Sequence, residues 1–246
     1  FGIEMIKGYD IKSMPNADLY VIGNALSRGN ESVEHILSNS LPFKSGPEML
    51  GEILKNKKVL AISGTHGKTT TSYMLTHIML DQGRDVGFLV GGISNNISGS
   101  ASLGSDGTFV IEADEYDSAF FDKRSKFIHY SPSTIVINNI EFDHADIFPD
   151  ITAIETQFHH LVRTIPQKGL VITNAMEQSL ERVIERGCWS PLERFGEKIG
   201  DWSMVDLLNA EGKPGADFAV LQRGQKCAEV HWASNSGVMG KHNQMN

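Results

Sequence analysis

From residue 57 onward, short apolar runs alternate with longer amphipathic segments, the pattern of strands followed by helices. This alternation predicts an α/β protein whose mostly parallel sheet is covered by helices on both faces. Pro166 and Gly169 mark the turn between the second expected helix and the strand that follows it. The expected strands are 59–63, 85–90, 108–112, 135–138 and 170–173, and the expected helices are 69–82, 151–164 and 179–186.

The two ends of the chain follow different patterns. Residues 17–23 predict a strand and residues 31–37 a helix, as in the second half of a Rossmann-like α/β domain. A domain boundary is expected at or just after residues 40–46, where Pro and Gly interrupt the pattern. Near the other end, residues 216–222 and 227–232 flank a polar turn and predict an antiparallel hairpin.

A glycine-rich segment, Ser63-Gly64-Thr65-His66-Gly67-Lys68-Thr69-Thr70, joins the expected strand 59–63 to the expected helix 69–82. A strand, a tight turn and a helix in this order form a phosphate cradle, because backbone N–H groups and the helix N-terminus point at the anion. The glycines let the backbone close around phosphate, Lys68 adds a positive charge, and the Thr69 hydroxyl is placed to ligate Mg²⁺. The segment therefore predicts a P-loop for a nucleoside triphosphate.

The usual eight-residue form of this loop begins with glycine, but position 62 of this chain is isoleucine. The simpler interpretation is a turn that carries Gly-Lys-Thr before a helix by chance. The flanking strand and helix favour the phosphate site instead. Its expected nucleotide-binding residues are Gly64, Thr65, His66, Gly67, Lys68, Thr69 and Thr70.

Four carboxylates lie at the end of the expected strand 108–112 and just beyond it, in the segment Glu112-Ala113-Asp114-Glu115-Tyr116-Asp117. Open α/β sheets bind ligands at the carboxyl ends of their strands, so Glu112, nearest the strand end, is a candidate Mg²⁺ ligand. The simpler interpretation is an acidic loop in contact with solvent. Because four carboxylates within six residues repel one another, the segment favours a bound cation.

A second polar segment, Asn138-Asn139-Ile140-Glu141-Phe142-Asp143-His144, follows the expected strand 135–138. A single histidine is more often structural than a ligand, but an Asp-His pair just beyond a strand end makes His144 a candidate metal ligand. Magnesium prefers oxygen, so a histidine ligand would suit Mn²⁺ better. The pair His159-His160 lies on the expected amphipathic helix and is interpreted as mainly structural.

Composition narrows the classes of function. The net charge of -8 argues against a nucleic-acid or membrane-surface partner. No apolar run approaches the about 20 residues of a membrane helix, and no secretory signal is visible, so a cytoplasmic protein is expected. Cys188 and Cys227 fit a reducing compartment, and nothing in the sequence requires a disulfide between them.

The order of four segments resembles the motif series of the Mur ligases, the ATP-dependent amide-forming enzymes of peptidoglycan synthesis. These segments are Gly-Thr-His-Gly-Lys-Thr-Thr, Glu-Ala-Asp-Glu, Asn-x-Glu-x-Asp-His and Gly-x-His-Asn-x-x-Asn. Within the family, residues 112–130 and 138–149 most resemble the enzymes that act in cell-wall recycling. Those members join the tripeptide L-Ala-γ-D-Glu-meso-diaminopimelate to UDP-N-acetylmuramate through an acyl phosphate. The resemblance implies ATP and Mg²⁺ as cofactors, and UDP-N-acetylmuramate and the murein tripeptide as substrates.

The resemblance also implies roles for individual residues. Lys68 and the loop 64–70 would hold the β- and γ-phosphates, and Thr69 and Glu112 would ligate one Mg²⁺. His144 would bind a second metal that bridges the γ-phosphate and the substrate carboxylate, so Lys68, Glu112 and His144 are the expected catalytic residues. Asparagine offers the paired donor and acceptor that suit the adenine edge. The residues expected near adenine are His242, Asn243 and Asn246, although this short string is also typical of a disordered tail.

The resemblance divides the chain into two parts. Residues 1–46 resemble the second half of the family's N-terminal domain for the uridine nucleotide, in which Ser27, Arg28 and Asn30 resemble the segment near that nucleotide. Residues 47–246 resemble the central ATP-binding domain, cut inside its last motif. Since the family's C-terminal domain is absent, the isolated chain is expected to bind nucleotide weakly and to show negligible ligation.

One departure from the family pattern leaves the ligands of the second metal open. Several Mur ligases carry a carbamylated lysine on the helix after the Asp-His pair, but residues 151–164 contain no lysine, and His159 falls near the expected position. Three alternative functions also stay open. They are the sibling ligase that adds L-alanine to UDP-N-acetylmuramate, a folate polyglutamylating ligase, and a nucleotide-binding module without catalysis.

Overall fold

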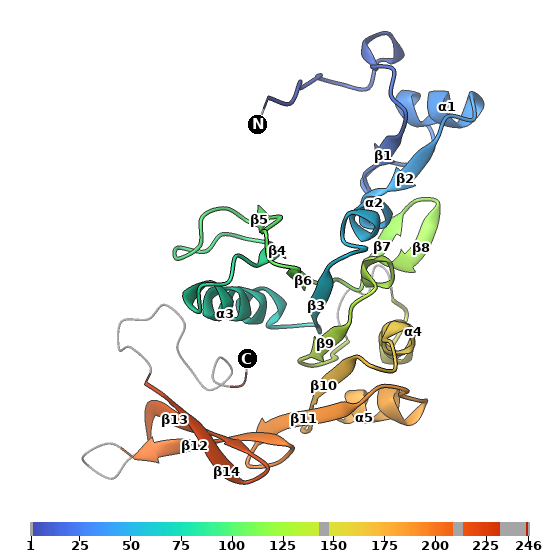
Figure 1. The fold of residues 1–246 in the computed structure, drawn as a ribbon. Helices are drawn as coiled ribbons and strands as arrows, with labels where there is room; N and C mark the ends of the chain where they lie inside the picture. The colour runs from blue at the N-terminus through green and yellow to red at the C-terminus, as the bar shows by residue number, and fades with distance from the viewer. Residues whose placement is uncertain (1, 143–147, 209–213, 232–244, 246) are drawn as a thin grey trace.

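A computed structural model of the chain describes residues 2–142, 148–208, 214–231 and 245. Its largest sheet has ten described strands in the order β14-β13-β12-β11-β10-β9-β3-β6-β4-β5 (Figure 1). The pairings from β12 through to β4 are parallel, whereas β5, β13 and β14 pair antiparallel at the two edges. The strands are β3 (Lys58–Ser63), β4 (Gly87–Leu89), β5 (Ala101–Ser102), β6 (Thr108–Glu112), β9 (Thr134–Ile137), β10 (Leu170–Asn174), β11 (Leu192–Glu197), β12 (Trp202–Leu208), β13 (Pro214–Gln222) and β14 (Gln225–Val230).

Helices cover this sheet on both faces, which confirms the predicted α/β class. Helix α3 (Lys68–Asp81) lies on one side in Figure 1, and α4 (Ile151–Thr164) and α5 (Gln178–Glu185) lie on the other. Alternation along β6 builds the two cores: Val110 packs with α3 and β4, while Phe109 and Ile111 pack with α4 and α5. The strands and helices predicted between residues 59 and 186 lie within two residues of those observed.

The N-terminal part forms a small unit with its own core. Strands β1 (Tyr20–Ile22) and β2 (Phe43–Ser45) pair in parallel, and α1 (Glu31–Ser38) connects them after the short helix η1 (Ile11–Ser13). Its core consists of Ile22, Val33 and Ile36. Helix α2 (Gly46–Ile53) follows directly and was not predicted. The Ser45 hydroxyl caps it by accepting from the Glu48 N–H at 3.2 Å.

A hairpin bridges the small unit and the large sheet. It consists of β7 (Asp117–Ala119) and β8 (Asp122–Ser125), and the short helix η2 (Lys126–Tyr130) follows it. At its tip, the ring of Phe121 meets the ring of Phe43 edge-on, with centroids 4.9 Å apart. Phe120 packs against the small unit's core. The acidic segment after β6 is therefore joined to the N-terminal unit through aromatic contacts.

Both cysteines are free thiols: Cys188 follows α5 and Cys227 lies in β14. Neither takes part in a disulfide. Within the described ranges, no helix combines the length and the hydropathy that crossing a membrane would require.

Helices α4 and α5 are joined by a buried carboxylate. The Glu155 side chain is 3% exposed and accepts from Arg182 at 2.6 Å and from Arg186 at 3.0 Å. We expect Glu155→Ala to lower the free energy of unfolding by about 1–3 kcal/mol, because both guanidinium groups lose their buried partner but still reach water. Denaturant unfolding measures this, with Glu185→Ala on the exposed face of α5 as the control. A loss no larger than that of the control would contradict a role for Glu155 in joining the helices.

Candidate nucleotide-binding site

Three polar segments meet at the carboxyl-terminal ends of three central strands of the large sheet. Strand β3 lies between β6 and β9 and runs parallel to both, so the carboxyl ends of the three strands lie side by side. The segments that leave these ends are 64–67, 113–117 and 138–142. The structure thus brings together the P-loop segment, the acidic segment and the described part of the Asn-Asn-Ile-Glu segment.

The P-loop backbone requires glycine where it approaches the segment after β9. Gly64 has φ 128°, and a Cβ there would lie 2.9 Å from the carbonyl oxygen of Asn139. Gly67 has φ 82° and precedes α3, whose N-terminus has no side-chain cap. The Thr65 N–H donates to the Asn139 carbonyl at 3.1 Å, and the His66 N–H donates to the Asn139 side chain at 2.8 Å. Asn139 therefore holds the loop in place, a role that the sequence did not indicate.

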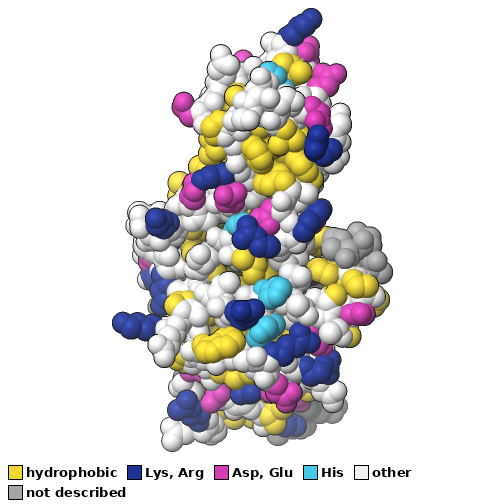
Figure 2. All heavy atoms as spheres, turned by 90° about the vertical axis from the view of Figure 1, so that its right-hand side faces the viewer, with side chains coloured by type: hydrophobic (Ala, Val, Ile, Leu, Met, Phe, Trp, Pro, Cys, Tyr) yellow, Lys and Arg dark blue, Asp and Glu magenta, His cyan; other side chains and the backbone are white. Residues whose placement is uncertain are grey.

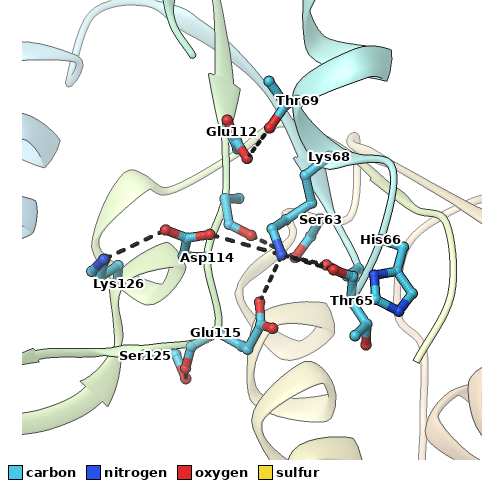
Figure 3. A network of polar contacts seen from close by, with 12 residues as sticks. Ser63, Thr65, His66, Lys68, Thr69, Glu112, Asp114, Glu115, Ser125 and Lys126 are labelled. Carbon is cyan, nitrogen blue, oxygen red and sulfur yellow. Dashed lines mark hydrogen bonds and ion pairs between the residues drawn. The ribbon is translucent and has the colours of Figure 1, made fainter. Parts of the chain in front are cut away.

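Lys68 opens α3, and its side chain turns back over the loop (Figure 3). Its ammonium donates to the carbonyl oxygens of Gly64 at 2.7 Å and Thr65 at 3.3 Å. It also pairs with Glu115 at 3.3 Å and with Asp114 at 3.8 Å. The side chains of Lys68 and Glu115 are only 11% and 2% exposed, so this pair is largely shielded from water. The positive charge is thereby fixed at the loop.

Thr69 and Glu112 point at each other between α3 and β6. The Thr69 hydroxyl donates to Glu112 Oε1 at 2.7 Å, and the Gly91 N–H donates to Glu112 Oε2 at 2.8 Å. Glu112 lies two residues after Val110 and so shares the face of β6 that meets α3. A hydroxyl and a carboxylate at this separation are oxygen ligands of the kind that Mg²⁺ prefers. The sequence indicated both side chains but not the Gly91 N–H, because that contact depends on the path of the loop after β4.

Lysines offset the repulsion that the sequence predicted among the carboxylates of the acidic segment. Asp114 pairs with Lys126 at 3.5 Å as well as with Lys68, and Asp117 pairs with Lys123. Lys68 of the P-loop, Lys123 of the β7–β8 hairpin and Lys126 of η2 therefore supply the counter-charge. Crowding among the carboxylates is consequently no argument for a bound cation.

The segment after β9 is tied to α3 and the P-loop by further polar contacts. The Asn138 side chain donates to the Thr71 hydroxyl at 3.0 Å, and the Glu141 N–H donates to the Thr65 hydroxyl at 2.9 Å. Burial raises the pKa of Glu177, which follows β10, and the charge of Glu141 raises it further. These contacts fix the base of the site on the β9 side.

Several predicted site residues lie outside the described residues. They are Asp143 and His144 of the expected metal site, and His242, Asn243 and Asn246 of the expected adenine site. In the part of the chain that the structure does describe, no three His, Cys, Asp or Glu side chains are grouped to hold a metal ion. Thr69 and Glu112 are the predicted metal ligands that the structure brings together.

His159 faces α5 in the described structure. Its ring centroid lies 6.2 Å from that of Trp189, and burial lowers the pKa of His159. The face drawn in Figure 2 shows histidine side chains among lysines and arginines near its centre. These contacts agree with a structural role for His159.

Tyr130 lies close to the acidic segment at the end of η2. Burial raises the pKa of the Tyr130 hydroxyl, and the nearby charge of Asp114 raises it further. A tyrosine is neutral at physiological pH in any case, so the shift only extends to higher pH the range over which the phenol beside Asp114 is uncharged.

The fold and the site define a P-loop α/β protein, and comparison with known proteins refines this class. Residues 62–246 match the family model described as the Mur ligase middle domain. The chain belongs to the Mur ligase family.

Individual relatives were found among curated proteins and solved structures. The chain is 49% identical over its whole length to the UDP-N-acetylmuramate–L-alanyl-γ-D-glutamyl-meso-2,6-diaminoheptandioate ligase of Haemophilus influenzae, of which it covers 52%. It is 32% identical to the UDP-N-acetylmuramate–L-alanine ligase of Clostridium acetobutylicum, of which it covers 51%. The crystal structure of the corresponding tripeptide ligase from Neisseria meningitides superposes with a TM-score of 0.84 at 49% identity, covering 93% of this chain and 71% of that one. The chain thus spans about half the length of the curated relatives that it matches.

Proposed function

We propose that this chain is the ATP-binding part of a ligase that joins L-Ala-γ-D-Glu-meso-diaminopimelate to UDP-N-acetylmuramate. The observation that carries the proposal is the P-loop with Lys68 held over it, beside the Thr69–Glu112 pair. Such a site suits transfer of a phosphoryl group, where catalysis consists mainly of alignment and charge stabilisation.

The proposed reaction has two steps. ATP phosphorylates the lactyl carboxylate of UDP-N-acetylmuramate, which gives an acyl phosphate and ADP. The α-amine of the tripeptide then attacks the acyl carbon, and inorganic phosphate leaves as the amide forms. A free carboxylate would have to expel oxide, so phosphorylation supplies the leaving group. Lys68 offsets the repulsion between the two anions that must meet.

The residues present fit a divalent metal. Thr69 Oγ1 and Glu112 Oε1 lie 2.7 Å apart and would hold Mg²⁺ beside the P-loop, while the Gly91 N–H keeps the carboxylate oriented. When bound, the metal would neutralise charge on the phosphate oxygens. His144 remains the proposed ligand of a second metal, for which Mn²⁺ is the alternative.

The choice of substrate rests on the relatives. Identity to the tripeptide ligase of Haemophilus influenzae is 49%, against 32% to the L-alanine ligase of Clostridium acetobutylicum, over the whole chain in both cases. We therefore place the tripeptide first and L-alanine second as the amine substrate. Both are small molecules, and we place the enzyme in the cytoplasm.

The proposed domain division follows the separation between the core of the N-terminal unit and the cores of the large sheet. Residues 1–46 would belong to a domain for the uridine nucleotide, and residues 47–246 to the central ATP-binding domain. The β1–β2 sheet has its own core, whereas Leu50 and Leu54, directly after it, pack into the core of the large sheet.

Phosphate release by the full-length protein tests the proposal. The protein would receive ATP, Mg²⁺ and UDP-N-acetylmuramate, with tripeptide in one reaction and L-alanine in the other. Stimulation by the tripeptide alone is the expected result. Stimulation by L-alanine alone would assign the protein to the second candidate, and stimulation by neither would refute the ligase function.

A further inference from the structure

Four oxygen atoms of the protein already surround the ammonium of Lys68, where a phosphate group of the nucleotide would also bind. A lysine has three N–H donors. Lys68 donates to the carbonyls of Gly64 and Thr65 at 2.7 and 3.3 Å and to Glu115 at 3.3 Å, while Asp114 lies 3.8 Å away and pairs with it by charge alone. An incoming phosphate therefore competes with Asp114 for the positive charge of Lys68.

The two carboxylates differ in how readily Lys68 can release them. The Glu115 side chain is 2% exposed, so separating it from Lys68 would break an ion pair that water hardly reaches. The Asp114 side chain is 34% exposed and lies farther from the ammonium. Asp114 is thus the partner that can leave at the lower cost.

Lys126 lies close enough to Asp114 to remain its ion-pair partner when Lys68 binds phosphate. Its ammonium lies 3.5 Å from Asp114 Oδ2, while Lys68 faces the other oxygen, Oδ1 (Figure 3). Lys126 is itself held by the ring of Tyr116, whose centroid is 5.4 Å from the ammonium. Its backbone N–H also donates to the Tyr116 carbonyl at 2.8 Å.

We infer that Lys126 is a positioning residue for nucleotide binding, which acts on Lys68 through Asp114. Lys126 retains Asp114 when phosphate engages Lys68, whereas Glu115 keeps the ammonium at the loop throughout. The inference rests on the proposed function, because it requires that the P-loop binds ATP.

The test measures the dissociation constant of a non-hydrolysable ATP analogue with Mg²⁺ in the full-length protein. Lys126→Gln should raise this constant about fivefold, the order expected for a partly exposed ion pair. In steady-state turnover the KM for ATP should rise more than kcat falls. Lys123→Gln makes the same charge change on the neighbouring hairpin, where Lys123 pairs with Asp117, and should leave the constant unchanged.

The double variant separates an effect through Asp114 from a direct attraction of Lys126 for the nucleotide. In the Asp114→Asn background, Lys126→Gln should cause no further loss of affinity. Lys126→Arg keeps the cation and should restore wild-type affinity, and unchanged thermal unfolding midpoints would show that the variants fold. The inference is overturned if Lys126→Gln weakens binding equally in both backgrounds, or has no effect in either. Failure of the unaltered protein to bind the analogue would instead overturn the proposed function, and this inference with it.

Discussion

Replacing Lys68 with alanine should reduce ATP turnover by the full-length protein at least about 100-fold, as loss of a preorganised charge at a reacting phosphate usually does. The ammonium is fixed at the loop by two loop carbonyls and by Glu115, so the variant removes a charge whose position is set before nucleotide binds. ADP formation in the presence of both substrates measures the effect. Activity retained within about tenfold would refute the P-loop assignment.

Two controls accompany this variant. Lys58→Ala removes an exposed lysine at the opposite end of β3 and should leave turnover unchanged. Since Lys68→Ala removes a counter-charge from the buried Glu115, the double variant Lys68→Ala with Glu115→Gln should also be made. Turnover should stay lost in the double variant even where its thermal unfolding midpoint recovers. Recovery of turnover would show that the single change acted through the fold.

Replacing Glu112 with glutamine should have the second-largest effect, a loss of turnover of about 100-fold at the Mg²⁺ concentration that saturates the wild type. Glutamine keeps the size of the side chain and an acceptor for the Thr69 hydroxyl, but it removes the charge that would ligate the metal. Turnover should therefore be measured across a range of Mg²⁺ concentrations, where half-saturation is expected to shift upward.

Asp117→Asn provides the matched control for this change. It removes a carboxylate from the same segment, but one that pairs with Lys123 on the hairpin. We expect its Mg²⁺ dependence to equal that of the wild type. If Glu112→Gln also kept the wild-type Mg²⁺ dependence, Glu112 would not be a metal ligand.

The sequence predicted those parts of the fold that depend on local pattern. Apolar runs mark β3, β6, β9 and β10 of a sheet that helices cover on both faces, and amphipathic faces mark α4 and α5. Helix α2 was missed although Ser45, Pro47 and Glu48 carry an N-terminal signature, because the glycine and proline favoured a boundary there. The β7–β8 hairpin was missed because the aromatic pair at its tip packs on Phe43, far away in sequence.

The residues of the candidate site likewise fall into those that the sequence indicated and those that it did not. Lys68, Thr69 and Glu112 could be found from sequence because each follows directly from its place at a strand end or helix start. The pairing of Asp114 with Lys126, and the hold of Asn139 on the P-loop, depend on loop paths that periodicity does not specify. For the same reason the sequence did not indicate that Lys68, Lys123 and Lys126 balance the negative charges of the acidic segment.

The alternation along β6 constrains how this sequence can change in length during evolution. Phe109, Ile111 and Ala113 face the core beneath α4 and α5, whereas Val110 and Glu112 face α3. Deleting one residue would exchange the two sets, so that the carboxylate would enter an apolar core and an isoleucine would meet Thr69. Insertions and deletions should therefore be purged from residues 108–113, even in lineages where single substitutions in the strand are accepted.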